Sequence, residues 1–246
     1  MRIAFFSDVH ANREALTACL DHAGRNRIDR YVFLGDLIGY GADPVFAVET
    51  AMDRVEQGAV AVLGNHDVAA LVPDRFMNDM AFAAMEWTRR RLDAVHLAFI
   101  EGLPLSVDDN GRLYVHASAD APSAWHYVAD RHAASKCLAA TGARATFCGH
   151  THVPALFHRS PAGRTASFRP DDSVDIPLTP GRRWLAVIGS VGQPRDHNPA
   201  ACYAVLDAAR DVLTYFRVPY DVDTAARKII DAGLPAALGQ RLFAGW

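Results

Sequence analysis

Clusters of aspartate, histidine and asparagine follow several short apolar segments of this chain. The first cluster, Asp8-Val9-His10, comes directly after the apolar residues 3–6. Later clusters repeat the arrangement, and they comprise Gly35-Asp36, Gly64-Asn65-His66-Asp67, His116 and Gly149-His150-Thr151-His152. Carboxylate, imidazole and amide groups are side chains that bind divalent metal ions. The repeated clusters therefore predict divalent metal chemistry.

Other kinds of active site lack support in the sequence. No serine or cysteine lies in a nucleophile-elbow pattern such as G-x-S-x-G. The chain has neither a phosphate-binding G-x-x-x-x-G-K-[ST] loop nor the G-x-G-x-x-G pattern of dinucleotide-binding enzymes. A glycosidase that uses two carboxylates would not need the histidines of the clusters.

The elements that must position these clusters alternate between strands and helices. Strands are predicted at residues 3–6, 29–34 and 59–63, and each is followed by a polar cluster. One helix is predicted to begin after Asn12, whose side chain is a typical N-cap, and another to run over residues 44–56. This alternation is typical of βαβ units in a largely parallel sheet. The clusters are then expected at the carboxyl ends of strands, where such sheets bind ligands.

The rest of the chain predicts helices and shorter strands. Asp109-Asn110-Gly111 is a strong turn signal for a hairpin between residues 105–107 and 112–115. Helices are predicted at residues 79–101, at 129–140 and from about Asp221 onward. Strands are predicted at residues 144–148, 155–158, 164–169, 183–189, 201–207 and 211–218. Residues 159–182, rich in Pro, Gly, Ser and Arg, are the best candidate for a long exposed loop. No linker interrupts the pattern, so a single domain over residues 1–246 is expected.

The composition is that of an ordinary globular protein. Half of the 246 residues are hydrophobic, and the formal net charge of −3 argues against an extended surface for nucleic acid or an anionic membrane. No apolar run approaches the ~18 residues that span a bilayer, and the N-terminal residues lack the pattern of a signal peptide. No CxxC pair is present, so free thiols in a cytoplasmic protein are expected for Cys19, Cys137, Cys148 and Cys202. The oligomeric state stays open.

Taken together, the five clusters resemble the motif blocks of the calcineurin-like metallophosphoesterase superfamily, in the usual order and over positions 8 to 152. The run Gly39-Tyr40-Gly41 is similar to that of its small bacterial and archaeal phosphodiesterases. The resemblance implies an α/β fold, a four-layer α/β/β/α sandwich of two mixed sheets. It also implies two divalent ions, whose identity (Mn, Fe, Zn, Ni or Co) the ligand types leave open.

The resemblance implies a set of ligands for each ion. The first ion would be held by Asp8, His10, Asp36 and His152. The second would be held by Asp36, Asn65, His116 and His150. The carboxylate of Asp36 would bridge the ions, and a hydroxide shared between them would attack the phosphorus of a small phosphoester in line.

The resemblance also assigns roles beyond metal binding. His66 would protonate the leaving oxygen or hold a phosphate oxygen. Asp67 would orient His66, and Asn65 is expected to contact the substrate as well. Arg195 lies in a glycine-rich turn over residues 189–198 that is similar to a loop near the metals in small bacterial members. It is expected to be a phosphate contact or a structural anchor, and the role of His197 in the same turn stays open.

Tyr40 departs from the protein phosphatases of this superfamily, which have an arginine in the pattern GDxVDRG. A guanidinium grips a doubly charged phosphomonoester, whereas tyrosine can only stack or form a single hydrogen bond. The change favours phosphodiesters as substrates. A phosphomonoesterase, a dinucleoside polyphosphate hydrolase and a non-catalytic scaffold remain as alternatives.

Overall fold

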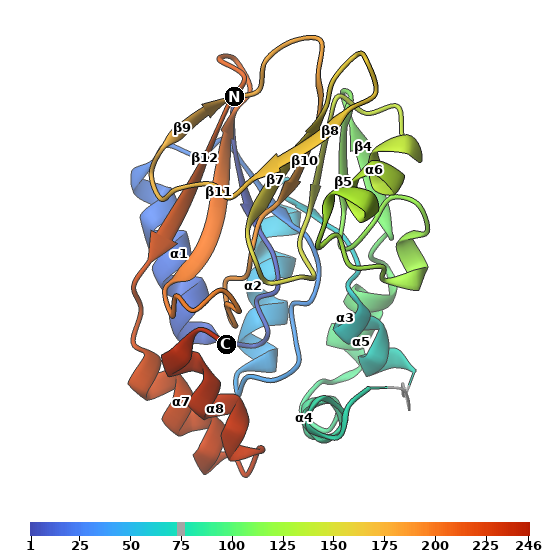
Figure 1. Cartoon of the computed structure of the whole chain (residues 1–246). Helices are drawn as coiled ribbons and strands as arrows, with labels where there is room; N and C mark the ends of the chain where they lie inside the picture. The colour runs from blue at the N-terminus through green and yellow to red at the C-terminus, as the bar shows by residue number, and fades with distance from the viewer. Residues whose placement is uncertain (73–76) are drawn as a thin grey trace.

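The computed structural model describes residues 1–72 and 77–246, and these form two six-stranded sheets packed face to face (Figure 1). The first sheet has the order β3-β2-β1-β11-β12-β9 and the second has the order β4-β5-β6-β10-β7-β8. The strands of the first sheet are β1 (Arg2–Phe6), β2 (Arg30–Phe33), β3 (Val60–Ala61), β9 (Asp175–Pro177), β11 (Ala201–Asp207) and β12 (Val212–Val218). Those of the second are β4 (Ser106–Asp109), β5 (Arg112–Val115), β6 (Ala145–Cys148), β7 (Ala155–Arg159), β8 (Thr165–Phe168) and β10 (Arg183–Val187).

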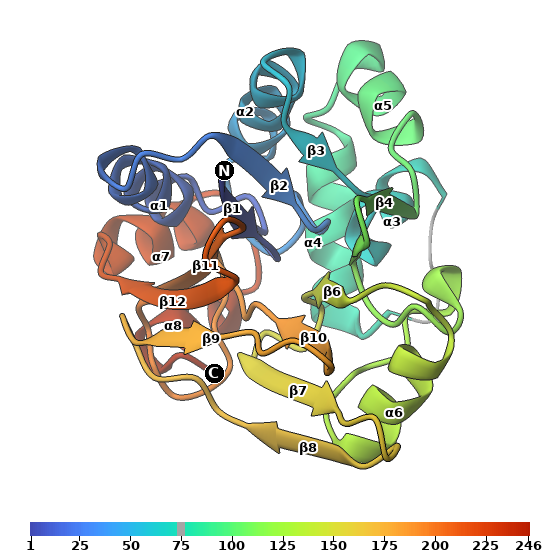
Figure 2. The same cartoon turned by 90° about the horizontal axis from the view of Figure 1, so that it is seen from above.

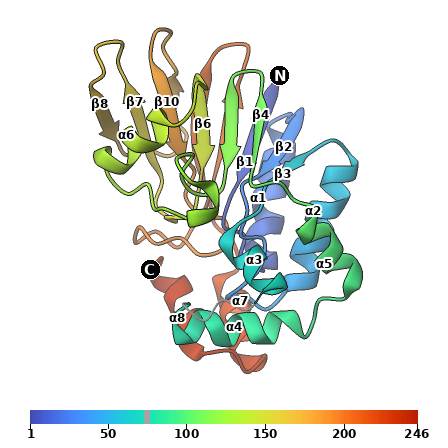
Figure 3. The same cartoon turned by 90° about the vertical axis from the view of Figure 1, so that its right-hand side faces the viewer.

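Helices cover the outer faces of both sheets and one end of the molecule. They are α1 (Arg13–Arg25), α2 (Pro44–Glu56), α3 (Asn65–Leu71), α4 (Asp79–Arg89), α5 (Ala94–Glu101), α6 (Arg131–Ala139), α7 (Val222–Asp231) and α8 (Ala236–Ala244). Seen from above, α1 and α2 lie outside the first sheet and α6 lies outside the second (Figure 2). The arrangement confirms the four-layer sandwich, and Figure 3 shows α4, α7 and α8 below the ends of the strands.

Both sheets are mixed. The strands β1, β2 and β3 are parallel, as the alternation of strands and helices predicts, whereas β11 pairs antiparallel with β1. In the second sheet β5, β6 and β10 are parallel to one another. The inner faces pack through large apolar side chains, and the rings of Phe5 and Phe147 stack with their centroids 4.1 Å apart. Burial of such side chains removes apolar surface from water and holds the two sheets together.

Several local predictions are confirmed. The Asn12 side chain caps α1 by accepting a hydrogen bond from the backbone N of Ala15, and α2 begins at Pro44. The turn at Asn110-Gly111 joins β4 to β5, and both residues have positive φ. All four cysteines are buried free thiols. In the described part of the chain, no helix is long and apolar enough to cross a membrane.

Other boundaries differ from the predictions. The helix predicted over residues 79–101 is two helices, because Asp93 caps a new one by accepting from the backbone N of Val95 and of His96. The last helix also divides, at Gly233, whose φ is +75°. Residues 159–182 are not one long loop, because they contain β8, which confirms the strand predicted at residues 164–169, and also the edge strand β9, which was not predicted. β9 forms because its backbone pairs with β12. A strand of three residues is too short to show a periodic pattern in the sequence.

Candidate metal centre

The polar clusters of the first sheet meet at the carboxyl ends of its parallel strands. Asp8 and His10 follow β1, and Asp36 follows β2. The two loops pair through their backbones, because the N of Asp8 donates to the Gly35 carbonyl at 3.1 Å and the N of His10 donates to the Asp36 carbonyl at 3.0 Å. The loop after β3 approaches so closely that a Cβ atom at Gly64 would overlap Asp36. Glycine is therefore required at this position for the loops to converge.

The second sheet brings its own clusters to the same place. His116 follows β5, and His150 follows β6. The backbone N of His150 donates to Asp8 Oδ2 at 3.0 Å, which joins the ends of the two sheets. A Cβ atom at Gly149 would overlap the Ser7 hydroxyl, so this crossing also needs glycine. The side chains named by the sequence thus converge from both sheets.

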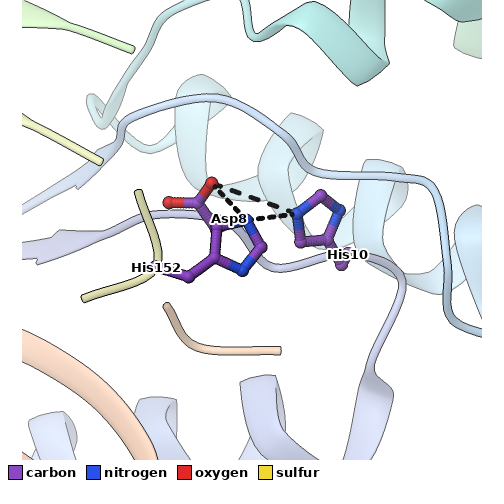
Figure 4. Close-up of side chains that lie close together, drawn as sticks. All are labelled: Asp8, His10 and His152. Carbon is purple, nitrogen blue, oxygen red and sulfur yellow. Dashed lines mark hydrogen bonds and ion pairs between the residues drawn. The ribbon is translucent and has the colours of Figure 1, made fainter. Parts of the chain in front are cut away.

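Asp8, His10 and His152 form the first group of candidate ligands (Figure 4). The Nε2 atoms of His10 and His152 lie 3.2 Å apart, and His152 Nε2 lies 3.2 Å from Asp8 Oδ1. The other ring nitrogens face backbone carbonyls, with His10 Nδ1 donating to Ile38 at 3.0 Å and His152 Nδ1 donating to Gln193 at 2.6 Å.

These contacts decide which nitrogen of each ring carries the proton when the ring is neutral. A carbonyl can only accept a hydrogen bond, so Nδ1 carries the proton and Nε2 presents a lone pair. The Nε2 lone pairs of His10 and His152 and the Oδ1 atom of Asp8 then face one another in the protein interior. This arrangement is unfavourable unless a cation or a proton lies between them, and it is the donor set that a divalent ion needs.

Asp36, His116 and His150 form the second group. His116 Nε2 lies 3.4 Å from Asp36 Oδ2, 3.1 Å from His150 Nδ1 and 3.2 Å from Asn65 Oδ1. His116 Nδ1 donates to the Leu34 carbonyl at 2.7 Å, so its Nε2 also presents a lone pair when the ring is neutral. Asp36 Oδ2 lies 3.7 Å from His10 Nε2 as well. The Asp36 carboxylate therefore lies between the two groups.

The electrostatics of the site also fit a cation. Burial raises the pKa of the Asp8 and Asp36 carboxyls, but the surrounding histidines together lower both pKa values below the usual range, chiefly His152 at Asp8 and His116 at Asp36. Burial lowers the pKa of His150 to about 4, and it lowers that of His10 further below its usual value. These carboxylates are ionised and these imidazoles are neutral at pH 7, as metal ligands must be.

His116 differs from the other candidate ligands. Burial lowers its pKa, but the Asp36 carboxylate outweighs that effect and raises the pKa to about 9. Without an ion, His116 therefore holds a proton at neutral pH. A divalent ion in this group would take the place of that proton.

His66 lies next to the first group, and a third possible group of metal ligands consists of His10, Asp36 and His66, whose ligand atoms lie within 4.8 Å of one another. Its ring is 4.9 Å from that of His10 and 4.6 Å from that of Tyr40, measured between centroids. Burial lowers the pKa of His66 to about 4, so the ring is neutral at pH 7. Its Nδ1 is buried and has no hydrogen-bond partner within the described residues. His66 Nδ1 thus lacks the hydrogen bond to a backbone carbonyl that orients the rings of His10, His116 and His152.

The prediction that Asp67 orients His66 by direct contact is wrong. The Asp67 carboxylate instead accepts hydrogen bonds from the backbone N of Asp36 at 2.8 Å, of Leu37 at 3.0 Å and of Gly64 at 3.0 Å. Asp67 lies at the start of α3, and its carboxylate oxygens bind the backbone of the loop that follows β2. Asp67 therefore positions the Asp36 loop rather than the imidazole beside it in sequence.

Tyr40 and Arg195 lie together next to these histidines. The ring of Tyr40 is 4.6 Å from that of His10, and the guanidinium of Arg195 lies over Tyr40. The glycine-rich turn is held to the site, because the backbone N of Gly192 donates to the Asp8 carbonyl at 2.9 Å. His197, in contrast, is exposed and belongs to neither ligand group.

Three aromatic and basic neighbours of the site were not predicted from the sequence. Tyr127 stacks on the His150 ring at 4.2 Å, and Trp125 lies edge-on to His116 at 5.8 Å. Arg241, in α8, reaches Gln193 beside the metal centre. These residues come from a loop and from the last helix, and no motif or spacing connects them to the clusters.

Comparisons with known proteins agree with this geometry. Residues 1–211 match the model of the calcineurin-like phosphoesterase superfamily domain, a family of metal-dependent phosphoesterases. An uncharacterised protein of Methanocaldococcus jannaschii is 32% identical over 249 residues, which cover 99% of this chain and 98% of that protein. A metallophosphoesterase crystal structure from Sphaerobacter thermophilus has a TM-score of 0.88 at 36% identity, with 100% of both chains covered. A hypothetical protein from Pyrococcus horikoshii, with a TM-score of 0.79 at 18% identity over 100% of this chain and 98% of its own, shares the fold. This chain belongs to the calcineurin-like phosphoesterase superfamily.

Proposed function

We propose that the protein is a phosphodiesterase that uses two divalent metal ions to hydrolyse small phosphodiesters. The observation that carries the proposal is the position of Asp36 between two groups of buried aspartate and histidine side chains. A carboxylate shared by two ligand groups suits a two-metal site, where the ions are about 3.5–4 Å apart. A single structural ion would not need the second group of ligands, Asp36, His116 and His150.

Each ion has a defined set of candidate ligands. Asp8, His10, Asp36 and His152 would hold the first ion, and Asp36, Asn65, His116 and His150 would hold the second. When bound, Mn, Fe, Zn, Ni or Co ions would supply a water of lowered pKa and a positive charge for the phosphoryl oxygens. The carbonyls of Ile38, Gln193 and Leu34 keep the ligand rings in the tautomer that this binding needs.

His66 is the side chain assigned to the leaving group. Its neutral ring lies next to those of Tyr40 and His10 and has no protein partner for its buried Nδ1 within the described residues. It would donate a hydrogen bond from its N–H to the departing oxygen, or a proton once the ring has taken one up, as the phosphorus–oxygen bond breaks. Asp67 supports this step indirectly, because it fixes the backbone of the loop that carries Asp36.

The preference for diesters rests on the charge beside the metal groups. Tyr40 is uncharged and occupies the place where protein phosphatases have an arginine, and Arg195 supplies the guanidinium over its ring. Tyr40 itself therefore offers no charge that could grip a second negative charge on the scissile phosphate. A diester carries a single charge on its phosphate and matches this arrangement.

The test is hydrolysis of bis-p-nitrophenyl phosphate by the purified protein with added Mn²⁺, with p-nitrophenyl phosphate assayed in parallel. The proposal expects turnover of the diester, and its loss after chelation. Faster hydrolysis of the monoester would support a phosphomonoesterase instead. No turnover of either compound with any of the five metals would support a non-catalytic scaffold.

A further inference from the structure

Two arginines from distant parts of the chain converge on one buried glutamine beside the metal centre. Arg195 Nη2 donates to Gln193 Oε1 at 2.9 Å, and Arg241 Nη1 donates to the same oxygen at 3.4 Å. The backbone carbonyl of Gln193 accepts from the candidate ligand His152. The two guanidiniums are therefore placed by the same residue that holds a metal ligand.

The charge of this pair is not balanced by the protein. Within residues 1–72 and 77–246, no carboxylate oxygen lies within 4.0 Å of either guanidinium, and the adjacent Asp196 pairs with Arg217 instead. Two positive groups that share one neutral oxygen repel each other. Burial and the charge of Arg195 together lower the pKa of Arg241. An anion between the guanidiniums would relieve this repulsion.

The pair also has an unused donor. Arg195 Nε is buried and has no hydrogen-bond acceptor among the described residues. A buried donor without an acceptor costs free energy, and a guanidinium offers its five N–H groups in the fork that suits phosphate oxygens. Arg195 is also placed toward the site, because its guanidinium carbon lies 5.7 Å from the centre of the Tyr40 ring.

We propose that Arg195 and Arg241 form a subsite for a second phosphate group of the substrate, separate from the phosphate that is cleaved. This inference rests on the proposed phosphodiesterase function and narrows its substrates to phosphodiesters that carry an additional phosphate. Arg241 belongs to α8, which lies beyond the residues 1–211 that match the family model. The subsite is thus a feature that the C-terminal helices add to the shared metal centre.

A pair of substrates that differ in a single phosphate tests the subsite. Thymidine 5′-(p-nitrophenyl phosphate) and its 3′-phosphorylated form have the same scissile bond and the same leaving group. The wild-type protein with Mn²⁺ is expected to have a higher kcat/KM for the 3′-phosphorylated compound. Arg241→Gln is expected to lower the ratio of the two kcat/KM values about ten- to hundred-fold, the effect of losing a charge-assisted hydrogen bond.

Matched variants separate charge from packing. Arg241→Lys keeps the charge and should retain part of the preference, although lysine cannot reproduce the guanidinium fork. Arg227→Gln, on the exposed surface of α7, should leave the ratio as it is in the wild type. Thermal unfolding of each variant shows whether α8 is still docked.

Two results would overturn the inference while leaving the phosphodiesterase function intact. The first is an equal or lower wild-type kcat/KM for the 3′-phosphorylated compound, which needs no variant to be measured. The second is an unchanged ratio in a folded Arg241→Gln protein. If this unchanged ratio came with an equal loss for both compounds, Arg241 would be placed on the scissile phosphate. Absence of turnover of both compounds by the wild type would count against the proposed function itself.

Discussion

The guanidinium carbon of Arg195 lies 5.7 Å from the centre of the Tyr40 ring, so two side chains 155 positions apart act as neighbours beside the metal centre. Tyr40 carries no charge, and an arginine from the turn over residues 189–198 lies next to it. Tyr40 is also 7% exposed and packs against the rings of His10 and His66. The charge and shape of the site around Tyr40 therefore depend on Arg195, His10 and His66 as well as on Tyr40 itself.

This relationship gives a prediction on specificity. The wild type should cleave diesters at least as efficiently as monoesters of the same alcohol, compared by kcat/KM. Tyr40→Arg should shift this ratio toward monoesters by about ten- to hundred-fold, because the added guanidinium pairs with the second charge. The variant should also unfold at a lower temperature, since a buried charge beside Arg195 is unfavourable. Tyr40→Phe keeps the ring and serves as the control; an equal fall of both activities in Tyr40→Arg would contradict the assignment.

Replacement of the shared carboxylate should affect both ions. Asp36→Asn is expected to abolish turnover and to lower the metal content of both groups, because an amide has no negative charge to share between two ions. The number of ions per chain can be measured by elemental analysis after gel filtration. Asp175→Asn changes an exposed aspartate on β9 and should bind metal as the wild type does. A Asp36→Asn protein with two full equivalents of metal would refute the bridging role.

Removal of His66 should leave the metals in place and slow the departure of poor leaving groups. Acid–base assistance contributes roughly 10²–10⁴-fold, so His66→Ala should lose about this much with an alkyl ester. The loss should be smaller with p-nitrophenolate, which departs without a proton. His132→Ala, at an exposed position of α6, is the control. Equal losses for both esters would point to substrate positioning, and loss of one ion would make His66 a metal ligand.

Asp67 should behave as a structural support of the site. Asp67→Asn turns an amide N–H₂ toward backbone N–H groups, which should lower the free energy of unfolding by roughly 1–3 kcal/mol. Urea denaturation measures this change, and metal affinity should fall because the Asp36 loop loosens. Asp130→Asn alters an exposed aspartate that accepts two backbone N–H groups at the start of α6, and it should have a smaller effect. A loss of activity that depends on the leaving group, without loss of stability, would restore a direct role with His66.

The sequence predicted which side chains converge at the candidate site, and the reason is physical. Asp8, Asp36 and His116 each end an apolar strand, and parallel strands bring their carboxyl ends to one edge, so residue type and position together indicated the site. The partners of Asp67 could not be predicted, because they are backbone amides of a loop whose path depends on the tertiary fold. Arg241 lies 46 positions after Arg195 in an ordinary helical pattern, and only the docking of α8 brings the two together.

The contacts of Asp8 have a consequence for the order of biosynthesis. Asp8 is among the first residues made, yet its carboxylate is held by the backbone of His150 and its carbonyl by that of Gly192. Ribosomes add roughly 5–20 residues per second, so Asp8 waits many seconds for these neighbours. A nascent chain shorter than about 190 residues therefore lacks the contacts that fix Asp8 in the folded protein. An ion at the proposed first group would join the loop after β1 to His152, which lies 144 positions later in the chain.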